Sequence, residues 1–313
     1  MNRTAFLFPG QGTQVVGMGK EIYEKYEEAK EVYNKASKIL DIDVAKLCFD
    51  GNEEELNKTE NTQIAILITS LAMLEVLRKN NIEADIVAGL SLGEYTALIY
   101  AGVISIEDGI SLIRKRGQIM QNNIPEGNWK MAAIIGLENE TVEEICMEAN
   151  EIIGFCKPAN YNCPGQVVVS GEEKAIETVI DMANERGAKK AILLNTSGPF
   201  HTIKLEKAKQ EFQKELEKVN IGKTKIEVVR NIDGRTYGEE DDIRDILARH
   251  MLSPVRFDET IKYMLNDGVD TFIEIGPGKT LTGFIKRASK EVKTANVNDL
   301  ESLEQLVSYE SNG

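Results

Sequence analysis

The five residues Gly89-Leu90-Ser91-Leu92-Gly93 constrain the fold of this chain more than any other segment. They fit a G-x-S-x-G turn between a short apolar run, residues 85–88, and a helical stretch, residues 94–101, that Gly102 ends. A turn of this kind lifts a serine hydroxyl clear of the sheet, and glycines on either side allow the backbone to bend. The pattern therefore predicts that Ser91 is a nucleophile on an α/β scaffold.

A nucleophilic serine needs a general base, and the sequence contains only two histidines, His201 and His250. His201 follows an apolar strand-like run, residues 191–194, and a turn at residues 197–199, and it precedes a helix that begins near Thr202. His250 lies inside a helical stretch, where a packed or solvent-facing ring is the ordinary expectation. A helix N-terminus also keeps an imidazole neutral. We expect His201 to be the base.

The first strand-like run, Thr4–Phe8, ends in the turn Pro9-Gly10-Gln11-Gly12. Such a turn either only ends a strand or presents backbone N–H groups to a substrate. In acyl-transfer sites one oxyanion donor is the N–H of the residue after the nucleophile, here Leu92, and the second comes from a nearby loop. We expect Gln11 to supply the second donor.

Three basic residues, 114–116, lie at the end of a helix that Ser105 begins. Ser105 and Asp108 fit a capping box, and Gly117 fits a C-terminal stop. Spacing alone leaves two interpretations open. The cations either complement the negative end of the helix dipole or bind an anionic substrate.

Two other patterns carry no site. Gly278-Lys279-Thr280 imitates the end of a P-loop, but the position of its first glycine is Ile273. The four cysteines form no C-x-x-C pair, and two histidines cannot complete a zinc site with them. We expect no metal site, and we expect reduced, packed thiols at Cys48, Cys146, Cys156 and Cys163.

Length and charge limit the class of function. A chain of 313 residues with 42% apolar content can bury a large core and a smaller companion domain. We see no charged-then-apolar leader and no uninterrupted apolar run near the roughly 20 residues of a membrane span, so we expect a cytoplasmic protein without a membrane partner. The net charge of −14 argues against nucleic acid as a partner.

The middle of the chain predicts a separate unit of strands and helices. Its order is strand 131–135, helix 141–150, strands 154–159 and 167–170, helix 173–186 and strand 191–194, which is ferredoxin-like. On either side strands alternate with helices, as a parallel sheet requires. We therefore expect an α/β fold with a hydrolase-like parallel-sheet core, residues 1–126 and 197–313, and an inserted ferredoxin-like subdomain, residues 127–196.

Taken together, these motifs resemble the malonyl-CoA:acyl carrier protein transacylases of fatty-acid synthesis and their acyltransferase relatives in polyketide synthases. The resemblance runs almost end to end and differs at two positions. Leu90 stands where the family often has His, and His250 stands where many members have Gln. The segments that carry it are Phe8-Pro9-Gly10-Gln11-Gly12, Thr62-Gln63, Gly89–Glu94, Arg116-Gly117, Asn160–Gln166, Gly198-Pro199-Phe200-His201, Ser253-Pro254-Val255-Arg256 and Glu274–Gly278.

The resemblance implies roles for five residues. Ser91 and His201 form a dyad, and the main-chain carbonyl of His250 orients His201 in place of a carboxylate. Arg116 holds the free carboxylate of a malonyl group through the paired hydrogen bonds that a guanidinium can make. Phe200 crowds out a branch at the acyl carbon, although it would also serve as ordinary core packing.

Three amides match family positions near the pocket, although isolated amides more often make local hydrogen bonds; they are Gln63, Asn160 and Gln166. The resemblance implies a gorge between the two parts of the fold as the active site, with no bound cofactor. The substrates it implies are malonyl-CoA, a coenzyme A thioester, and an acyl carrier protein with a phosphopantetheine thiol, in fatty-acid biosynthesis.

We expect a monomer whose carrier partner docks on the basic residues Lys286, Arg287 and Lys290. Two other functions stay open. One is a serine hydrolase, which passes its acyl group to water, and the other is a non-catalytic module that binds carrier proteins.

Overall fold

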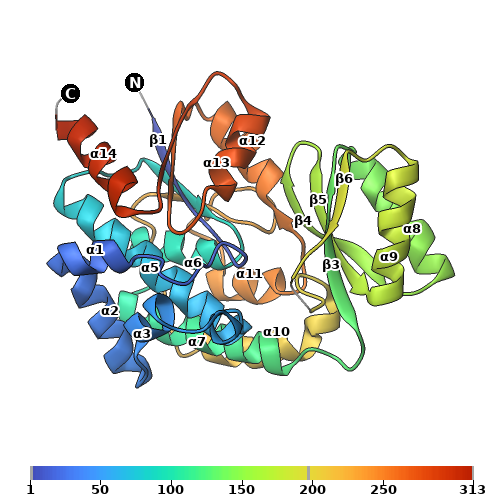
Figure 1. Cartoon of the computed structure of the whole chain (residues 1–313), viewed down its shortest axis with the longest axis horizontal. Coiled ribbons are helices and arrows are strands. Elements are labelled where there is room, and N and C mark those ends of the chain that lie inside the picture. The colour runs from blue at the N-terminus through green and yellow to red at the C-terminus, as the bar shows by residue number, and fades with distance from the viewer. Residues whose placement is uncertain (1–2, 196–197, 312–313) are drawn as a thin grey trace.

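The larger part of the molecule is built around a parallel five-stranded sheet (Figure 1). The computed structural model describes residues 3–195 and 198–311. The order of strands in this sheet is β10-β9-β1-β2-β7, and every neighbouring pair is parallel. Its strands are β1 (Thr4–Phe8), β2 (Ile86–Gly89), β7 (Glu227–Val229), β9 (Thr271–Ile275) and β10 (Lys293–Val297). The predicted α/β core with a parallel sheet is confirmed.

Helices cover both faces of this sheet. They are α1 (Lys20–Lys25), α2 (Glu27–Leu40), α3 (Val44–Phe49), α4 (Glu53–Leu56), α5 (Thr59–Lys79), α6 (Leu92–Tyr100), α7 (Ile106–Asn122), the 3-10 turn η1 (Ile203–Leu205), α10 (Glu206–Leu216), α11 (Ile243–His250), α12 (Phe257–Asn266), α13 (Thr280–Ala288) and α14 (Leu300–Ser311). Phe6 and Phe8 pack with α5 and α7, whereas Ala5 and Leu7 pack with α12 and α13. Burial on both faces is the ordinary condition of a parallel sheet.

A second sheet carries the predicted ferredoxin-like unit. Its order is β6-β3-β5-β4-β8, and the neighbours among the first four strands are antiparallel. The elements are β3 (Trp129–Ile135), α8 (Asn139–Ile152), β4 (Cys156–Cys163), β5 (Gln166–Glu172), α9 (Glu173–Glu185) and β6 (Lys190–Leu193). Both helices pack on the same sheet, at the right of Figure 1. The element order is the predicted β-α-β-β-α-β.

The fifth strand of this sheet comes from another part of the chain. β8 (Val255–Arg256) pairs in parallel with β4, and Asn160 is opposite Val255. A two-residue strand from the predicted core segment therefore extends the second sheet. The division of the chain at 126/127 and 196/197 stays a prediction, and its second boundary lies outside the described residues.

The helix that carries Arg116 does not end there. α7 continues to Asn122, so the prediction of a helix stop at Gly117 is wrong. Gly117 instead allows α5 and α7 to approach closely, since a Cβ at this position would lie 2.7 Å from the Cα of Glu60. The predicted start is correct, because the Ser105 hydroxyl accepts a hydrogen bond from the Asp108 N–H at 3.0 Å. Arg116 therefore lies inside a packed helix.

One described helix, α5, is long and apolar enough by composition to cross a membrane. Within the protein, 83% of its most apolar window is buried. It packs against α2 and α7 as the central helix of the core.

Candidate active site

The predicted turn around Ser91 connects β2 to α6. Ser91 has φ 51° and ψ −99°, a conformation that residues other than glycine rarely adopt. The flanking glycines are required by space. A Cβ on Gly89 would lie 1.9 Å from the carbonyl carbon of Gly93, and one on Gly93 would lie 2.0 Å from the Phe8 oxygen. The serine is thus held at the carboxyl end of the parallel sheet.

His201 lies beside this serine. Its Nε2 is 2.8 Å from the Ser91 Oγ, and its Nδ1 is 3.1 Å from the main-chain oxygen of His250. A carbonyl only accepts hydrogen bonds, so Nδ1 carries the proton and donates a hydrogen bond to the His250 carbonyl oxygen. Nε2 is left with a lone pair that faces the serine hydroxyl, which is the tautomer a general base needs.

Burial keeps the His201 ring neutral. Burial, and after it the nearby Arg116 cation, lower the pKa of His201 to about 4. The sequence suggested a helix N-terminus as the cause, but α10 begins only at Glu206, after the short turn η1. The low pKa therefore follows from desolvation and a neighbouring charge.

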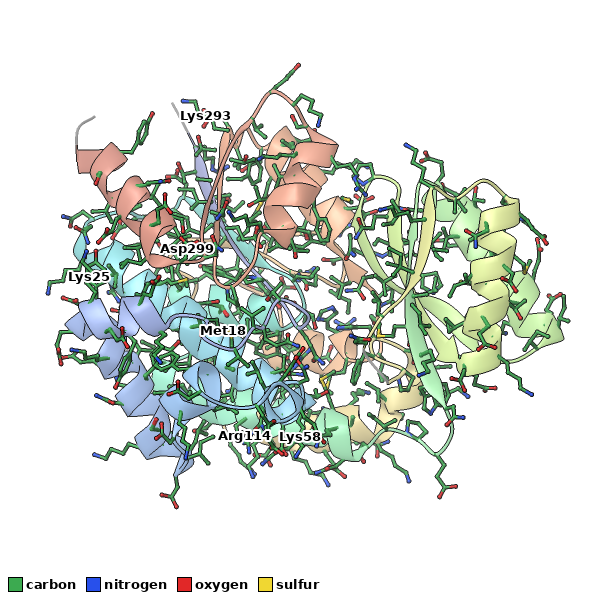
Figure 2. All side chains as sticks on the ribbon, viewed as in Figure 1. Met18, Lys25, Lys58, Arg114, Lys293 and Asp299 are labelled. Carbon is green, nitrogen blue, oxygen red and sulfur yellow. The ribbon has the colours of Figure 1, made fainter. Side chains whose placement is uncertain are left out.

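Arg116 points inward to the same serine. It is 1% exposed, its Nη2 donates to the Ser91 Oγ at 3.1 Å, and its Nη1 donates to the Gln63 Oε1 at 2.8 Å. Its guanidinium carbon also lies 5.1 Å from the centre of the Tyr95 ring. Arg114, labelled in Figure 2, points elsewhere, to the start of α5. Its Nη1 donates a hydrogen bond to the Glu60 main-chain oxygen at 2.9 Å.

Arg116 makes no salt bridge in the part of the chain that the structure describes, and the buried Glu94 carboxyl interacts with its charge only beyond salt-bridge distance. No carboxylate there lies within 4.0 Å of the Arg116 guanidinium, and its Nε has no hydrogen-bond partner. Burying a charge is costly unless it is paired. The guanidinium is thus suited to an anion that enters from outside the fold.

A cavity of about 470 Å³ lies between the two sheets and brings together nearly all of the predicted site residues. Its lining includes Gln11, Gln63, Ser91, Leu92, Arg116, Asn160, Gln166, Phe200 and His201. His250 does not line it, because this residue lies behind His201. The arrangement agrees with the gorge that the sequence predicts between the two parts of the fold.

Two backbone N–H groups on the cavity wall are free to bind a ligand. Leu92 begins α6 and Gln11 follows β1, and among the described residues neither N–H meets a hydrogen-bond acceptor. Both positions agree with the predicted oxyanion donors. Developing negative charge beside Ser91 could be stabilised by such a pair.

The remaining predicted residues have different surroundings on the cavity wall. Phe200 is buried next to His201, and its ring lies against Gly198, where an added Cβ would be 2.7 Å away. The Gln166 Oε1 accepts a hydrogen bond from Arg287 Nη1 at 2.9 Å, so this amide contacts the predicted basic patch. The Gln63 side chain is committed to Arg116.

Two polar residues beneath the turn were not predicted, Asn231 and Glu94. Asn231 bridges the turn, since its Oδ1 accepts from the Ser91 N–H and its Nδ2 donates to the Gly89 oxygen, both at 2.6 Å. Glu94 is buried directly below and accepts from the Asn231 N–H at 3.3 Å. Asn231 follows the buried strand β7, the neighbour of β2, and a polar residue at that strand end was a usable signal.

Within residues 3–195 and 198–311, no group of three or more His, Cys, Asp or Glu side chains is arranged to hold a metal ion. The four cysteines are free and buried, as the sequence predicts.

Comparison with known proteins agrees with this geometry. The model of the acyl transferase domain family matches residues 5–307. The malonyl CoA-acyl carrier protein transacylase of Bacillus subtilis is 42% identical over 307 residues, which cover 98% of this chain and 97% of the relative. The enzyme of the same name from Staphylococcus aureus strain MW2 is 38% identical over 303 residues, 97% of this chain and 98% of the relative.

Solved structures extend the likeness to three dimensions. The malonyl CoA-acyl carrier protein transacylase of Clostridium perfringens is 45% identical and superposes with a TM-score of 0.94, covering 99% of this chain and 98% of its own. A malonyl-transacylase solved in complex with a type II PKS acyl-carrier protein is 38% identical with a TM-score of 0.94, covering 98% and 100%. The resemblance inferred from the motifs is confirmed, and the chain belongs to the acyl transferase domain family.

Proposed function

We propose that this chain transfers a malonyl group from malonyl-CoA to the phosphopantetheine thiol of an acyl carrier protein in fatty-acid biosynthesis. One observation carries the choice of substrate. Arg116 is buried without a salt bridge to any described residue, and its Nη2 is 3.1 Å from the Ser91 Oγ. The malonyl carboxylate is one methylene beyond the carbonyl that Ser91 attacks, which brings it within reach of this guanidinium. The relatives described above are named for the same substrates, which supports this choice.

Acylation begins with the Ser91 hydroxyl. Its Oγ bonds to the thioester carbonyl carbon while its proton passes to His201 Nε2. The carbonyl oxygen gains the negative charge and accepts hydrogen bonds from the Leu92 and Gln11 N–H groups. When the carbon–sulfur bond breaks, His201 returns the proton to the coenzyme A thiolate. A malonyl ester on Ser91 remains.

Transfer to the carrier repeats these steps in reverse order. The phosphopantetheine thiol gives its proton to His201, and its sulfur attacks the ester carbonyl. The bond to Ser91 Oγ breaks, the serine regains its proton, and the carrier leaves with the malonyl thioester. The His250 carbonyl, 3.1 Å from Nδ1, stabilises the imidazolium that forms in each half-reaction.

Other residues of the wall adjust the pocket. Phe200 fills the space beside His201 and disfavours a branched acyl group. Gln63 fixes the Nη1 group of Arg116 by a hydrogen bond. Asn160 and Gln166 add polar side chains to the cavity wall on the side of the second sheet.

The active unit is proposed to be a monomer in the cytoplasm. Ser91, His201, Arg116 and the two N–H donors line one cavity, and His250 lies behind His201. Four free, buried cysteines agree with a reducing compartment.

The test is the intact mass of the protein after mixing with malonyl-CoA or acetyl-CoA, with no acceptor present. We expect one stable malonyl adduct, which then moves to a holo acyl carrier protein when that is added. An adduct lost rapidly to water would indicate a serine hydrolase instead. Failure to form any adduct would support a non-catalytic module that binds carrier proteins.

A further inference from the structure

Glu94 is an acidic residue below the nucleophile turn that no step of the proposed reaction uses. Its side chain is 1% exposed, yet it lies two positions into α6, within reach of the elements that hold both Ser91 and His201. We propose that Glu94 is a positioning residue that fixes the Ser91 turn through Asn231 and limits the movement of His250 through contact with its imidazole ring. The inference rests on the proposed acyl transfer at Ser91.

The connection to Ser91 runs through Asn231. Glu94 Oε1 accepts the Asn231 backbone N–H at 3.3 Å, which fixes the point where the chain leaves β7. The Asn231 amide then joins the Gly89 oxygen to the Ser91 N–H. Ser91 is held at a positive φ, a strained conformation that persists only when the surroundings enforce it. These hydrogen bonds supply that enforcement.

The same bridge selects the oxyanion donor. Because the Ser91 N–H is occupied by Asn231, it cannot bind a substrate oxygen. The neighbouring Leu92 N–H stays free and becomes the donor that the turn offers to the cavity. A loss of the bridge would therefore disturb both the nucleophile and the oxyanion donor beside it.

Tyr237 holds Glu94 in place. Its buried hydroxyl donates to Glu94 Oε1 at 2.6 Å, so this single oxygen accepts two hydrogen bonds. Each bond is from a buried donor, which has no water as an alternative partner. The carboxyl group therefore has a fixed position under the turn.

The other carboxyl oxygen faces the histidine pair. Glu94 Oε2 lies 3.3 Å from His250 Nδ1, a contact that is close but not directed as a hydrogen bond. The centres of the His250 and His201 rings are 4.8 Å apart with the rings tilted by 36°, and the His250 main-chain oxygen accepts a hydrogen bond from the His201 Nδ1–H. Glu94 thus limits how far His250, and with it the base, can move.

Burial moves both contacting groups toward their neutral forms. Burial raises the pKa of Glu94 to about 7 and lowers the pKa of His250 well below its ordinary value. A glutamine at position 94 resembles the protonated acid, because its oxygen can accept the two hydrogen bonds and its NH₂ can face His250. Glu94→Gln should therefore preserve the positioning role.

Single-turnover acylation by malonyl-CoA tests the role. We expect Glu94→Ala to lower the maximum acylation rate constant on the order of 100-fold, the scale for misplacing a reacting group by about 1 Å. The half-saturating concentration of malonyl-CoA should stay within about threefold, since Glu94 does not line the cavity. Glu94→Gln should restore the rate to within about threefold of wild type.

A tyrosine pair controls for a simple loss of stability. Tyr237→Phe removes the hydroxyl that holds Glu94, and Tyr33→Phe removes an equally buried hydroxyl that contacts Thr69 Oγ1 at 2.9 Å, away from the cavity. We expect Tyr237→Phe to slow acylation about five- to tenfold and Tyr33→Phe to leave it unchanged. This pair also decides the matter if Glu94→Ala does not fold.

Three results would overturn the inference. Acylation by Glu94→Ala at the wild-type rate would show that the carboxyl group is not needed. Equal slowing by both tyrosine variants would reduce its role to stability. A wild-type protein that takes no malonyl group would overturn the proposed function and this inference together, whereas the first two results leave that function intact.

Discussion

His201 is anchored from behind by the main chain of His250, whose carbonyl oxygen is 3.1 Å from the His201 Nδ1. A carbonyl fixes the tautomer and supports the imidazolium as a carboxylate does, but without a full negative charge. No carboxylate therefore has to be placed beside the base. The arrangement also leaves the His250 side chain free to vary as long as the main chain keeps its position.

His250→Gln should keep most of the acylation activity, whereas His201→Gln should lose on the order of 10²- to 10⁴-fold. The glutamine keeps the carbonyl, and its amide can still face Glu94 in place of the His250 ring. Single-turnover acylation rates of the two variants measure the difference. Similar losses in both would mean that the base is misassigned or that His250 has a second role.

Ser91→Ala should abolish covalent malonylation and leave the fold intact, because only a hydroxyl is removed from the turn. His201→Ala should slow the same step on the order of 10²- to 10⁴-fold. Intact-protein mass after mixing with malonyl-CoA measures the adduct, and thermal unfolding checks the fold. A full malonyl adduct on Ser91→Ala would show that the nucleophile is another residue.

The pH dependence of acylation should report the low pKa of His201. The His201 ring of the free enzyme has a pKa of about 4, so it becomes protonated only at low pH. We therefore expect kcat/KM to stay level from pH 8 to about pH 5 and to fall at lower pH. A bound malonyl carboxylate offsets the Arg116 charge, one cause of that low pKa. The limb in kcat should therefore lie at higher pH than the limb in kcat/KM.

Stopped-flow acylation across this range gives both limbs. Arg116→Ala removes the same charge permanently, so its kcat/KM limb should also move to higher pH. A wild-type kcat/KM that already falls near pH 6.5 would mean that the His201 ring is not kept neutral by burial.

The sequence was sufficient to single out Ser91 and His201, which the structure brings together, and to predict the parallel sheet, because each has a local or countable signal. The apolar run before Ser91 and the glycines around it specify a strand, a turn and a helix. Only two histidines could serve as the base. The pattern of alternating strands and helices then predicted the sheet.

The features that the sequence did not predict depend on contacts between distant segments. A glycine such as Gly117 often ends a helix, but here it allows the close approach of α7 to α5. Glu94 and Asn231 are 137 positions apart and meet only because β7 is the neighbour of β2. β8 has two residues, too few for any periodic signal. Local patterns contain none of this information.

Carrier docking should depend on the basic residues at the end of α13. This helix begins on the cavity wall at Thr280, and its last turn exposes Lys286 and Arg287. Because the chain carries a net charge of −14, an acidic carrier needs a local patch rather than general attraction. Lys286→Glu with Lys290→Glu should raise the KM for the carrier about tenfold and spare acylation by malonyl-CoA.

Lys214→Glu is the matched control for this pair, since Lys214 is exposed on α10 and does not line the cavity. It should leave the carrier KM unchanged. An unchanged KM in the double variant as well would assign docking to another surface.

Arg116 should decide between malonyl and acetyl groups. Its guanidinium is buried beside Ser91, and we propose that it pairs with the carboxylate that malonyl-CoA has and acetyl-CoA lacks. Removing one partner of a desolvated ion pair costs about 3–5 kcal/mol, so Arg116→Ala should lower kcat/KM for malonyl-CoA roughly a hundredfold or more. The kcat/KM for acetyl-CoA should rise relative to that for malonyl-CoA, because the uncharged acetyl group no longer lies beside an unpaired cation.

Arg116→Lys separates charge from geometry. Lysine supplies the cation without the two-pronged donor set, and it cannot reach Gln63 and the substrate in the same way, so only part of the malonyl activity should return. The measurement is the malonyl-to-acetyl ratio of kcat/KM in wild type and both variants. If Arg116→Ala lowers kcat/KM for both substrates by the same factor, the residue supports the packing of α7 against α5 and does not select the acyl group.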